Sequence, residues 1–239
     1  MKDILLVLDV ETANSVDDAL VYDLGLAVVD RKGNIYCKKS FVNSDIFYGE
    51  ANLMTSSYYA HKLPKYYEEI KNGEREVATL YEIRQFILGL FEQYKIRAVC
   101  AYNASFDQRA LNTTQRWQTK SKYRYFLPYD VEIWDIWHMA CQVICTMTTY
   151  RKFCETHNYF SKSGNMITNA ETVYQFITKD DQFREEHMGL ADVEIETQIM
   201  ANCFRKHKTM DKGINRACWR IPQKSTTPKK RKPSMYDPL

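Results

Sequence analysis

The chain has 239 residues, of which 45% are apolar and 26% are charged, and its formal net charge is +3. This length and apolar content suit one globular domain with a packed core. No apolar run approaches the ~18 residues of a membrane span, and residues 4–8 are too short for a secretory signal, so the sequence predicts an intracellular protein.

Residues 4–8 (ILLVL) form the first predicted element, a strand buried on both faces. It is followed by Asp9 and Glu11, whose side chains leave one face of an extended backbone about 6 to 7 Å apart along the strand. Two like charges beside a core are costly unless their pKa values rise or a cation neutralises them. A hard divalent ion such as Mg²⁺ or Mn²⁺ would meet that need. Alternatively, the strand ends at Asp9 and both acids are solvated.

Alternating apolar residues over 19–29 and 35–42, with a glycine turn between them, predict a hairpin after the first strand. Helical spacing over residues 79–94 predicts a helix, and 98–102 a short strand beside and parallel to the first. Asn103 and Asp107 follow that strand, so they should lie at the same edge of the sheet as Asp9.

Residues 131–134 are predicted to form a further strand, with Asp135 capping the next helix and a short helix at 171–177. The nearby His138, Cys141, Cys145, Cys154 and His157 have the residue types of a zinc site. Their spacing matches no familiar zinc module, and core packing of cysteine is the commoner outcome. The seven cysteines are odd in number and form no C-x-x-C pair, which indicates reduced thiols.

Two stretches combine aromatic and basic residues and are candidate nucleic-acid surfaces. One is the segment 45–75, which includes Tyr58, Tyr59, Lys62 and Tyr66, and the other is 116–125. A surface helix and a solvated loop, respectively, are the alternative interpretations.

His187 precedes a predicted helix whose first turns contain Asp192. Beyond that helix, residues 220–239 hold six basic side chains against one acidic, which leaves about −2 for the rest of the chain. We expect residues 1–210 to form the domain and 211–239 a disordered basic tail. Such a tail can attract polyanions, serve as a nuclear import signal through residues 228–233, or simply aid solubility.

Three motifs in this order resemble the DEDDh (DnaQ-like) family of 3′–5′ exonucleases, in the ribonuclease H-like superfamily. They are Asp9-Val-Glu11, residues 103–107 (NASFD), and His187 followed five positions later by Asp192. The resemblance covers residues 3–205. It implies an α/β fold, a five-stranded mixed sheet in the order 3-2-1-4-5 flanked by helices.

The resemblance also implies chemistry. Asp9, Glu11, Asp107 and Asp192 would bind two divalent cations, Mg²⁺ or Mn²⁺, and His187 would be the general base. Thr12 and Asn103 match positions that hold the terminal nucleotide, and Phe106 one that packs near it or belongs to the core.

The expected function is hydrolysis of phosphodiester bonds at nucleic-acid 3′ ends, with single-stranded DNA favoured. The alternatives are an exoribonuclease of the same fold and a catalytically inactive nucleic-acid-binding module. No polymerase-binding motif, second domain or protein partner is evident, so we expect a stand-alone nuclease of a bacterium or phage. Its expected location is cytoplasmic, with a nuclear one left open by the tail.

Overall fold

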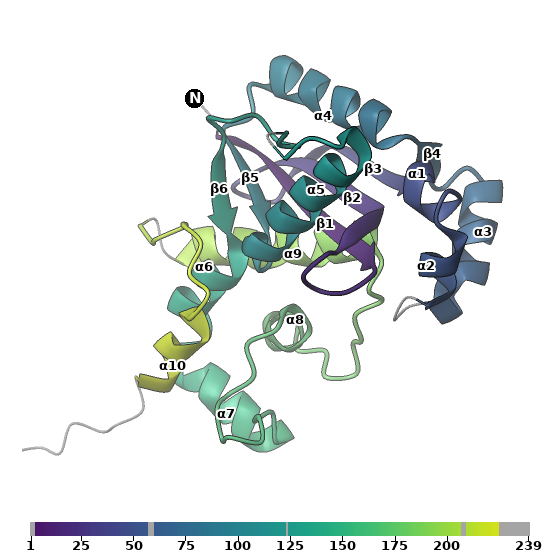
Figure 1. The fold of residues 1–239 in the computed structure, drawn as a ribbon. Helices are drawn as coiled ribbons and strands as arrows, with labels where there is room; N and C mark the ends of the chain where they lie inside the picture. The colour runs from purple at the N-terminus through teal and green to yellow at the C-terminus, as the bar shows by residue number, and fades with distance from the viewer. Residues whose placement is uncertain (1–2, 57–59, 123, 207–208, 225–239) are drawn as a thin grey trace, which may run out of the picture.

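The structure, a computed structural model, describes residues 3–56, 60–122, 124–206 and 209–224. A mixed sheet lies at its centre, and helices cover both faces (Figure 1). The strands are β1 (Ile4–Ala13), β2 (Leu20–Asp30), β3 (Ile35–Asn43), β4 (Glu76–Ala78), β5 (Ala98–Ala101) and β6 (Glu132–Asp135).

The strand order is β4-β3-β2-β1-β5-β6. Strands β1, β2 and β3 pair antiparallel, and β5 and β6 continue parallel to β1. The predicted ribonuclease H-like order of five strands is therefore confirmed. The short β4 is an addition that pairs parallel with the outer edge of β3, and its three residues were too few to give a sequence pattern.

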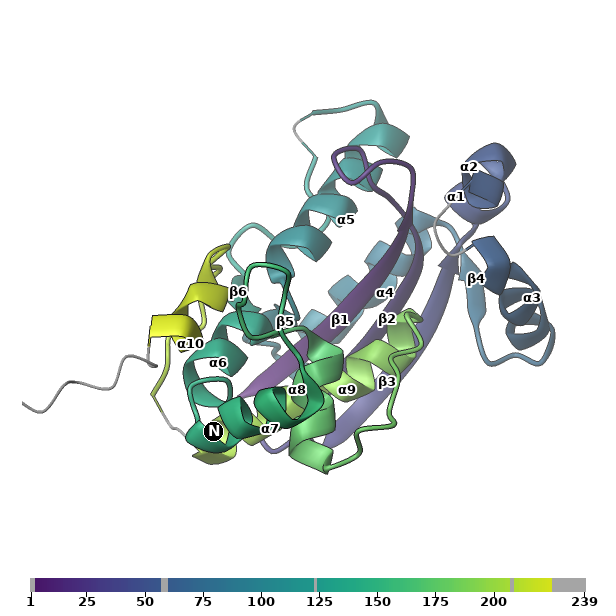
Figure 2. The same cartoon turned by 90° about the horizontal axis from the view of Figure 1, so that it is seen from below.

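The helices α4 (Leu80–Tyr94) and α5 (Ala104–Thr119) cover one face of the sheet, where they pack on Leu6, Leu8 and Val10 of β1. The opposite face, which includes Leu5 and Val7, is covered by the remaining large helices (Figures 1 and 2). These are α6 (Ile136–Val143), α7 (Thr148–His157), α8 (Ala170–Thr178) and α9 (Gly189–Lys206). Because side chains alternate along a strand, Asp9 and Glu11 share the α9 side with Leu5 and Val7.

Residues 44–56 and 60–71 include short helices beside the β3–β4 edge of the sheet (Figure 2). They are α1 (Ser44–Phe47), α2 (Ala51–Ser56), the 3₁₀ helix η1 (Ala60–Lys62) and α3 (Leu63–Lys71). Their apolar side chains pack with Tyr22 of β2 in a third core cluster. This segment had no clean period in the sequence because each helix is too short to show one.

Several predicted elements are present in the structure, together with the local turn and capping features that stabilise them. The hairpin turn has Gly33 at φ +84°, and α4 begins with a capping box between Thr79 and Glu82. Asp135 caps α6 by accepting hydrogen bonds from the backbone N–H groups of Trp137 and His138. The possibility that the first strand ends at Asp9 is wrong, since β1 runs through both acids to Ala13.

Two expected boundaries differ from the structure. Helix α5 continues to Thr119 and takes in the first part of the stretch 116–125, which was expected to be a loop or substrate rim. Residues 211–224 were assigned to the tail, yet they include η2 (Cys218–Arg220) and α10 (Ile221–Lys224) and pack against α6. There the buried Cys218 and backbone hydrogen bonds, such as Asp135 N–H to the Lys212 carbonyl at 2.7 Å, outweigh the polar composition. The rest of the tail lies outside the described residues.

Strand β2 and the start of α9 approach each other backbone to backbone. A Cβ atom at Gly25 would overlap the carbonyl carbon of Gly189, and one at Gly189 would lie 2.5 Å from the backbone nitrogen of Gly25. Gly25 is also the register partner of Asp9. The two glycines therefore bring the first turn of α9 against the acidic part of β1.

We expect Gly25→Ala to lower the free energy of unfolding by about 1 to 3 kcal/mol, because the added methyl group must push α9 away from the sheet. Gly89→Ala is the control, since Gly89 lies in α4 with open space around its Cβ position and alanine favours helix. Urea unfolding of both variants measures the difference. Equal stability of the two variants would contradict the close approach.

Candidate functional site: an acidic cluster at the end of β1

Five carboxyl groups from three elements gather where β1 and β5 meet the first turns of α5 and α9. Asp9 and Glu11 come from β1, and Asp107 from the first turn of α5. Asp192 and Glu196 lie one helical turn apart on α9, so they share a face of that helix. Apart from Asp9, each of the five is at most 8% exposed.

Burial and mutual repulsion raise the pKa values of these acids. Burial is the larger cause and raises the pKa of Glu11 to about 9, with Asp192 adding repulsion. It also raises the pKa of Asp107 and of Asp192 to about 8, although the backbone N–H of Val10 stabilises the Asp107 carboxylate. The pKa of Asp9 is raised well above its usual range by burial and by the surrounding carboxylates, Glu196 first among them.

Three carboxylate oxygens of the cluster are shielded from solvent and have no hydrogen-bond partner within the described parts of the chain. They are Asp9 Oδ2, Asp192 Oδ1 and Glu196 Oε2. A buried carboxylate oxygen without a partner is costly, and a cation is the partner that would satisfy several of them at once. The oxygen-rich donor set is the kind that Mg²⁺ and Mn²⁺ prefer. The residues present therefore fit divalent metal ions.

His187 lies beside this cluster on the loop before α9. Its ring nitrogen, a Glu11 oxygen and an Asp192 oxygen all lie within 4.8 Å of one another. Burial, reinforced by the charge of Lys62, lowers the pKa of His187 below its usual 6.5, so the imidazole is neutral at pH 7. A neutral imidazole can accept a proton from a water molecule beside the carboxylates.

The side chains expected to hold the terminal nucleotide lie around the same edge of the sheet, where β1 and β5 end. Thr12 follows Glu11 at an irregularity in the β1–β2 pairing. Asn103 is exposed at the end of β5 in the left-handed region, at φ +64°, and its side chain does not cap α5. Phe106 is partly buried against the core, with Arg109 over its ring at 5.8 Å, so the alternative that it packs in the core holds for part of its surface.

Two carboxyl groups near the site were not identified from the sequence, and Lys62 was expected only as part of a nucleic-acid surface. Glu196 could have been noticed from its spacing of four residues after Asp192, and Glu185 from its place in the His187 loop. Burial raises the pKa of Glu185 to about 7. Lys62 belongs to a segment distant in sequence, and no local pattern links it to the cluster whose carboxylate pKa values it lowers.

The histidines and cysteines considered as possible zinc ligands do not form a zinc site among the described residues. Cys141, Cys145 and Cys154 are buried in the core, His138 Nδ1 hydrogen-bonds the Gly213 carbonyl at 2.8 Å, and His157 stacks on a tyrosine. Over residues 3–56, 60–122, 124–206 and 209–224, Glu11, His187 and Asp192 are the only group of three or more histidine, cysteine or acidic residues whose ligand atoms all lie within 4.8 Å of one another. Core packing, which the spacing favoured, is what the structure shows for these cysteines.

The candidate nucleic-acid surfaces are only partly available. Tyr66 of the 45–75 segment is fully buried, with its ring edge-on to Tyr22 at 5.7 Å, so the interpretation that it stacks on bases is wrong. Tyr67 is half exposed, whereas Tyr58 and Tyr59 lie outside the described residues. In the other stretch, Tyr125 is half exposed with Arg116 over its ring at 5.3 Å.

Comparison with known proteins identifies the fold. No family model and no curated protein matches the sequence. Solved structures of exonuclease I do match, among them a complex named SSB/Exonuclease I with the inhibitor CFAM, at a TM-score of 0.54 and 14% identity over 87% of this chain and 43% of that one. The chain has the fold of exonuclease I.

Two further structures agree with this result. Exonuclease I of Methylocaldum szegediense matches at a TM-score of 0.51 and 15% identity, over 92% of this chain and 42% of that one. E. coli exonuclease I with a dA16 oligonucleotide matches at a TM-score of 0.51 and 14% identity, over 87% of this chain and 42% of that one. The chain thus spans less than half the length of these exonuclease I chains. The ribonuclease H-like fold that the resemblance to DEDDh exonucleases implied is confirmed, and at this identity the likeness concerns the fold alone.

No helix among the described residues has the length and apolar character needed to cross a membrane.

The raised pKa values predict how a metal ion should affect stability at different pH. In the metal-free folded state the pKa of Asp107 and Asp192 is about 8, above the 3.8 of an ordinary aspartate, so the folded state holds these protons more tightly than the unfolded chain does. This stability is present below about pH 4 and is lost as the pH rises through 8. A bound divalent cation favours the ionised form and should offset the loss.

We therefore expect Mn²⁺ to raise the unfolding temperature by about 5 °C or more at pH 8, and by much less at pH 5. Differential scanning fluorimetry with and without EDTA measures both shifts. Calcium-free buffer and an unrelated protein of similar size serve as controls. An equal shift at the two pH values would show that the ion binds somewhere other than the acidic cluster.

Proposed function

We propose that this chain is a metal-dependent 3′–5′ exonuclease that hydrolyses phosphodiester bonds at the 3′ ends of nucleic acid and releases nucleoside monophosphates. The observation that carries the proposal is the convergence of Asp9, Glu11, Asp107 and Asp192 with a neutral histidine. Three buried carboxylate oxygens there lack hydrogen-bond partners among the described residues. A protein that only binds nucleic acid gains nothing from buried, repelling acids, which disfavours the inactive module.

Each acid has a proposed place in the site. Asp9 stands on the central strand between the others and would contact both ions, Glu11 and Asp192 would hold one, and Asp107 the other. Divalent ions held by these acids would make a water molecule more acidic and would offset the charge on the leaving oxygen. His187 accepts the proton of the attacking water, since its imidazole is neutral and near Glu11 and Asp192.

The substrate favoured is single-stranded DNA. Structures with this fold include E. coli exonuclease I in complex with dT13 and dA16 oligonucleotides. Thr12 and Asn103 are proposed to contact the terminal nucleotide and the exposed part of Phe106 to pack near it. An exoribonuclease differs only in the contacts made to the 2′-hydroxyl.

The test uses 5′-labelled DNA and RNA oligonucleotides of equal sequence, with Mn²⁺ or Mg²⁺ and again with EDTA. We expect a ladder that shortens from the 3′ end on DNA, and none with EDTA. Asp107→Ala should abolish the ladder because an ion loses its carboxylate, whereas Asp130→Ala, at an exposed site away from the cluster, should leave it unchanged. A ladder of equal strength from the Asp107→Ala variant would show that the ions are assigned wrongly.

Loss of the proposed base should slow cleavage without abolishing metal binding. We expect His187→Ala to lower kcat by on the order of 10²-fold or more, since general-base catalysis typically contributes that much. Single-turnover cleavage at saturating Mn²⁺ measures the rate, and the thermal shift with Mn²⁺ checks that ions still bind. An unchanged single-turnover rate would exclude His187 as the base.

A further inference from the structure

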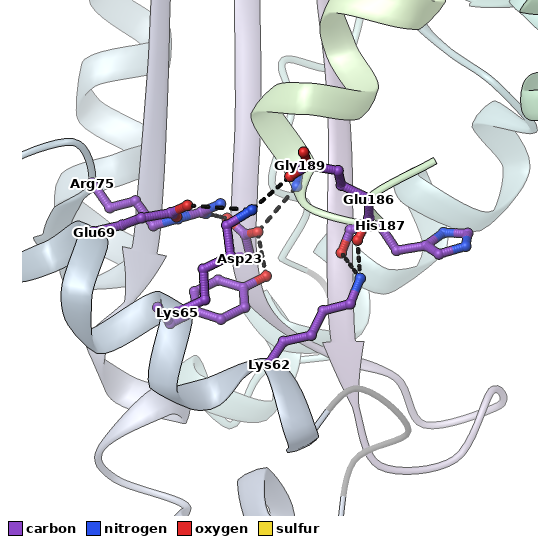
Figure 3. A network of polar contacts seen from close by, with 9 residues as sticks. Asp23, Lys62, Lys65, Glu69, Arg75, Glu186, His187 and Gly189 are labelled. Atoms are coloured by element: carbon purple, nitrogen blue, oxygen red, sulfur yellow. Dashed lines mark hydrogen bonds and ion pairs between the residues drawn. The ribbon is translucent and has the colours of Figure 1, made fainter. Parts of the chain in front are cut away.

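The loop that carries His187 is fastened to a segment more than a hundred residues away in the chain. This segment, residues 60–75, comprises η1, α3 and the turn to Arg75, and we call it the clamp segment. Figure 3 shows Lys62 and Lys65 of the clamp segment pointing toward Glu186 and His187. The clamp segment contributes no residue to the acidic cluster, so its role differs from that of the proposed metal ligands.

His187 needs such support because of its backbone conformation. Its φ is +52°, in the left-handed region that a residue with a Cβ atom adopts at a cost of about 1 to 2 kcal/mol. A loop released from its contacts would relax toward the ordinary regions, and the imidazole would move with it. The position of the ring beside Glu11 and Asp192 therefore depends on what holds the loop.

One tie is made by Lys62. Its ammonium group donates hydrogen bonds to the backbone carbonyls of Glu186 and His187, the latter at 3.4 Å (Figure 3). These bonds hold the main chain on both sides of the strained peptide. Lys65 adds an ion pair with the Glu186 carboxylate at 2.7 Å, but both side chains are about half exposed, so this contact contributes little.

The second tie runs through Asp23 of β2, which is fully buried. Its carboxylate accepts a hydrogen bond from the backbone N–H of Gly189 at 3.0 Å, two residues after His187. The clamp segment orients that carboxylate. The Arg75 guanidinium donates to it at 2.5 Å (Figure 3). The Tyr66 hydroxyl donates to it at 2.7 Å.

Arg75 is itself fixed by three contacts. It bonds Asp23 and Glu69, each at 2.5 Å, and lies over the Tyr66 ring at 4.5 Å. It is only 7% exposed, so these charge-assisted bonds operate away from bulk water and keep a defined geometry. The chain of contacts from α3 through Asp23 to Gly189 is thus continuous.

We propose that the clamp segment sets the position of His187, with Lys62 and Tyr66 as positioning residues that act through the loop backbone and through Asp23. The inference rests on the proposed function, because it assigns the clamp segment to the placement of the general base. It also gives a role to part of a segment for which the sequence alone allowed two interpretations, a nucleic-acid surface or a surface helix.

The test compares four variants of the full chain. Lys62→Met removes the ammonium and keeps the apolar stem, and Lys62→Arg restores a donor. Tyr66→Phe removes one hydroxyl and leaves the buried ring and every charge in place. Lys71→Met is the matched control, because Lys71 is exposed at the end of α3 and makes no contact with the loop among the described residues.

Two quantities are measured. Hydrogen exchange of the amides of residues 186–189, without nucleic acid or metal, should be about tenfold faster in Lys62→Met and Tyr66→Phe than in the parent chain. In the cleavage assay, kcat should fall by about tenfold or more in both variants while KM changes by less than about twofold, because the base is misplaced and the nucleotide contacts remain. Lys62→Arg should recover much of the loss, and Lys71→Met should behave as the parent.

The outcomes separate this inference from the proposed function. Unchanged exchange in both Lys62→Met and Tyr66→Phe would overturn the role of the clamp segment even if the chain is an active nuclease. Faster exchange with an unchanged kcat would overturn it as well, since the loop would then be held for a reason other than the placement of His187. An inactive parent chain would contradict the proposed function, while the exchange measurement would still decide whether the clamp segment holds the loop.

Discussion

Five carboxyl groups are held together at one end of a buried strand, and this arrangement costs free energy. The rest of the site depends on it. Burial alone raises their pKa values, and each acid raises those of its neighbours. Such a cluster is a local weakness in a fold whose core is otherwise apolar. Divalent cations would offset that cost, because the same unpaired oxygens that destabilise the metal-free protein would serve as ligands of the ion.

The backbone arrangement around the cluster is as specific as the acids themselves. The approach of Gly25 to Gly189 leaves no room for a side chain, so α9 begins directly over Asp9 and its first turns deliver Asp192 and Glu196. The bonds from Lys62 and Asp23 then fix the loop before α9. Strain at His187 is therefore maintained by contacts made on both of its sides, as expected for a residue whose conformation serves a site.

The fold is that of exonuclease I, whose solved chains are more than twice as long as the part matched here. Beside the central strands lie the edge strand β4, the short helices before it and the packed residues 211–224. The helices η1 and α3 contact the loop of His187 through Lys62 and Lys65, so they influence the environment of the site. Arg216 of residues 211–224 hydrogen-bonds Ser105 at 3.0 Å, between Asn103 and Asp107. Segments outside the five central strands thus reach the site from two sides.

The sequence by itself determined the central sheet, the cap of α6 and the identity of the four motif acids. The local signals are the alternation along β1 and β2, the glycine at the hairpin turn and Asp135 before α6. Each of them affects residues only a few positions away in the sequence. The pairing of β1 with β5 followed from a topological rule, since a helix between two strands returns the second parallel to the first.

Only the tertiary structure decided what surrounds those acids. Glu196 joins the cluster because α9 packs across β1, Tyr66 is buried because Asp23 offers its hydroxyl a partner, and Cys218 anchors residues 211–224 in spite of their polar composition. None of these outcomes has a local signal, because each depends on burial and on partners that are distant in the chain. Residue types and their spacing specify which groups are available, whereas desolvation and non-local contacts decide which of them share a site.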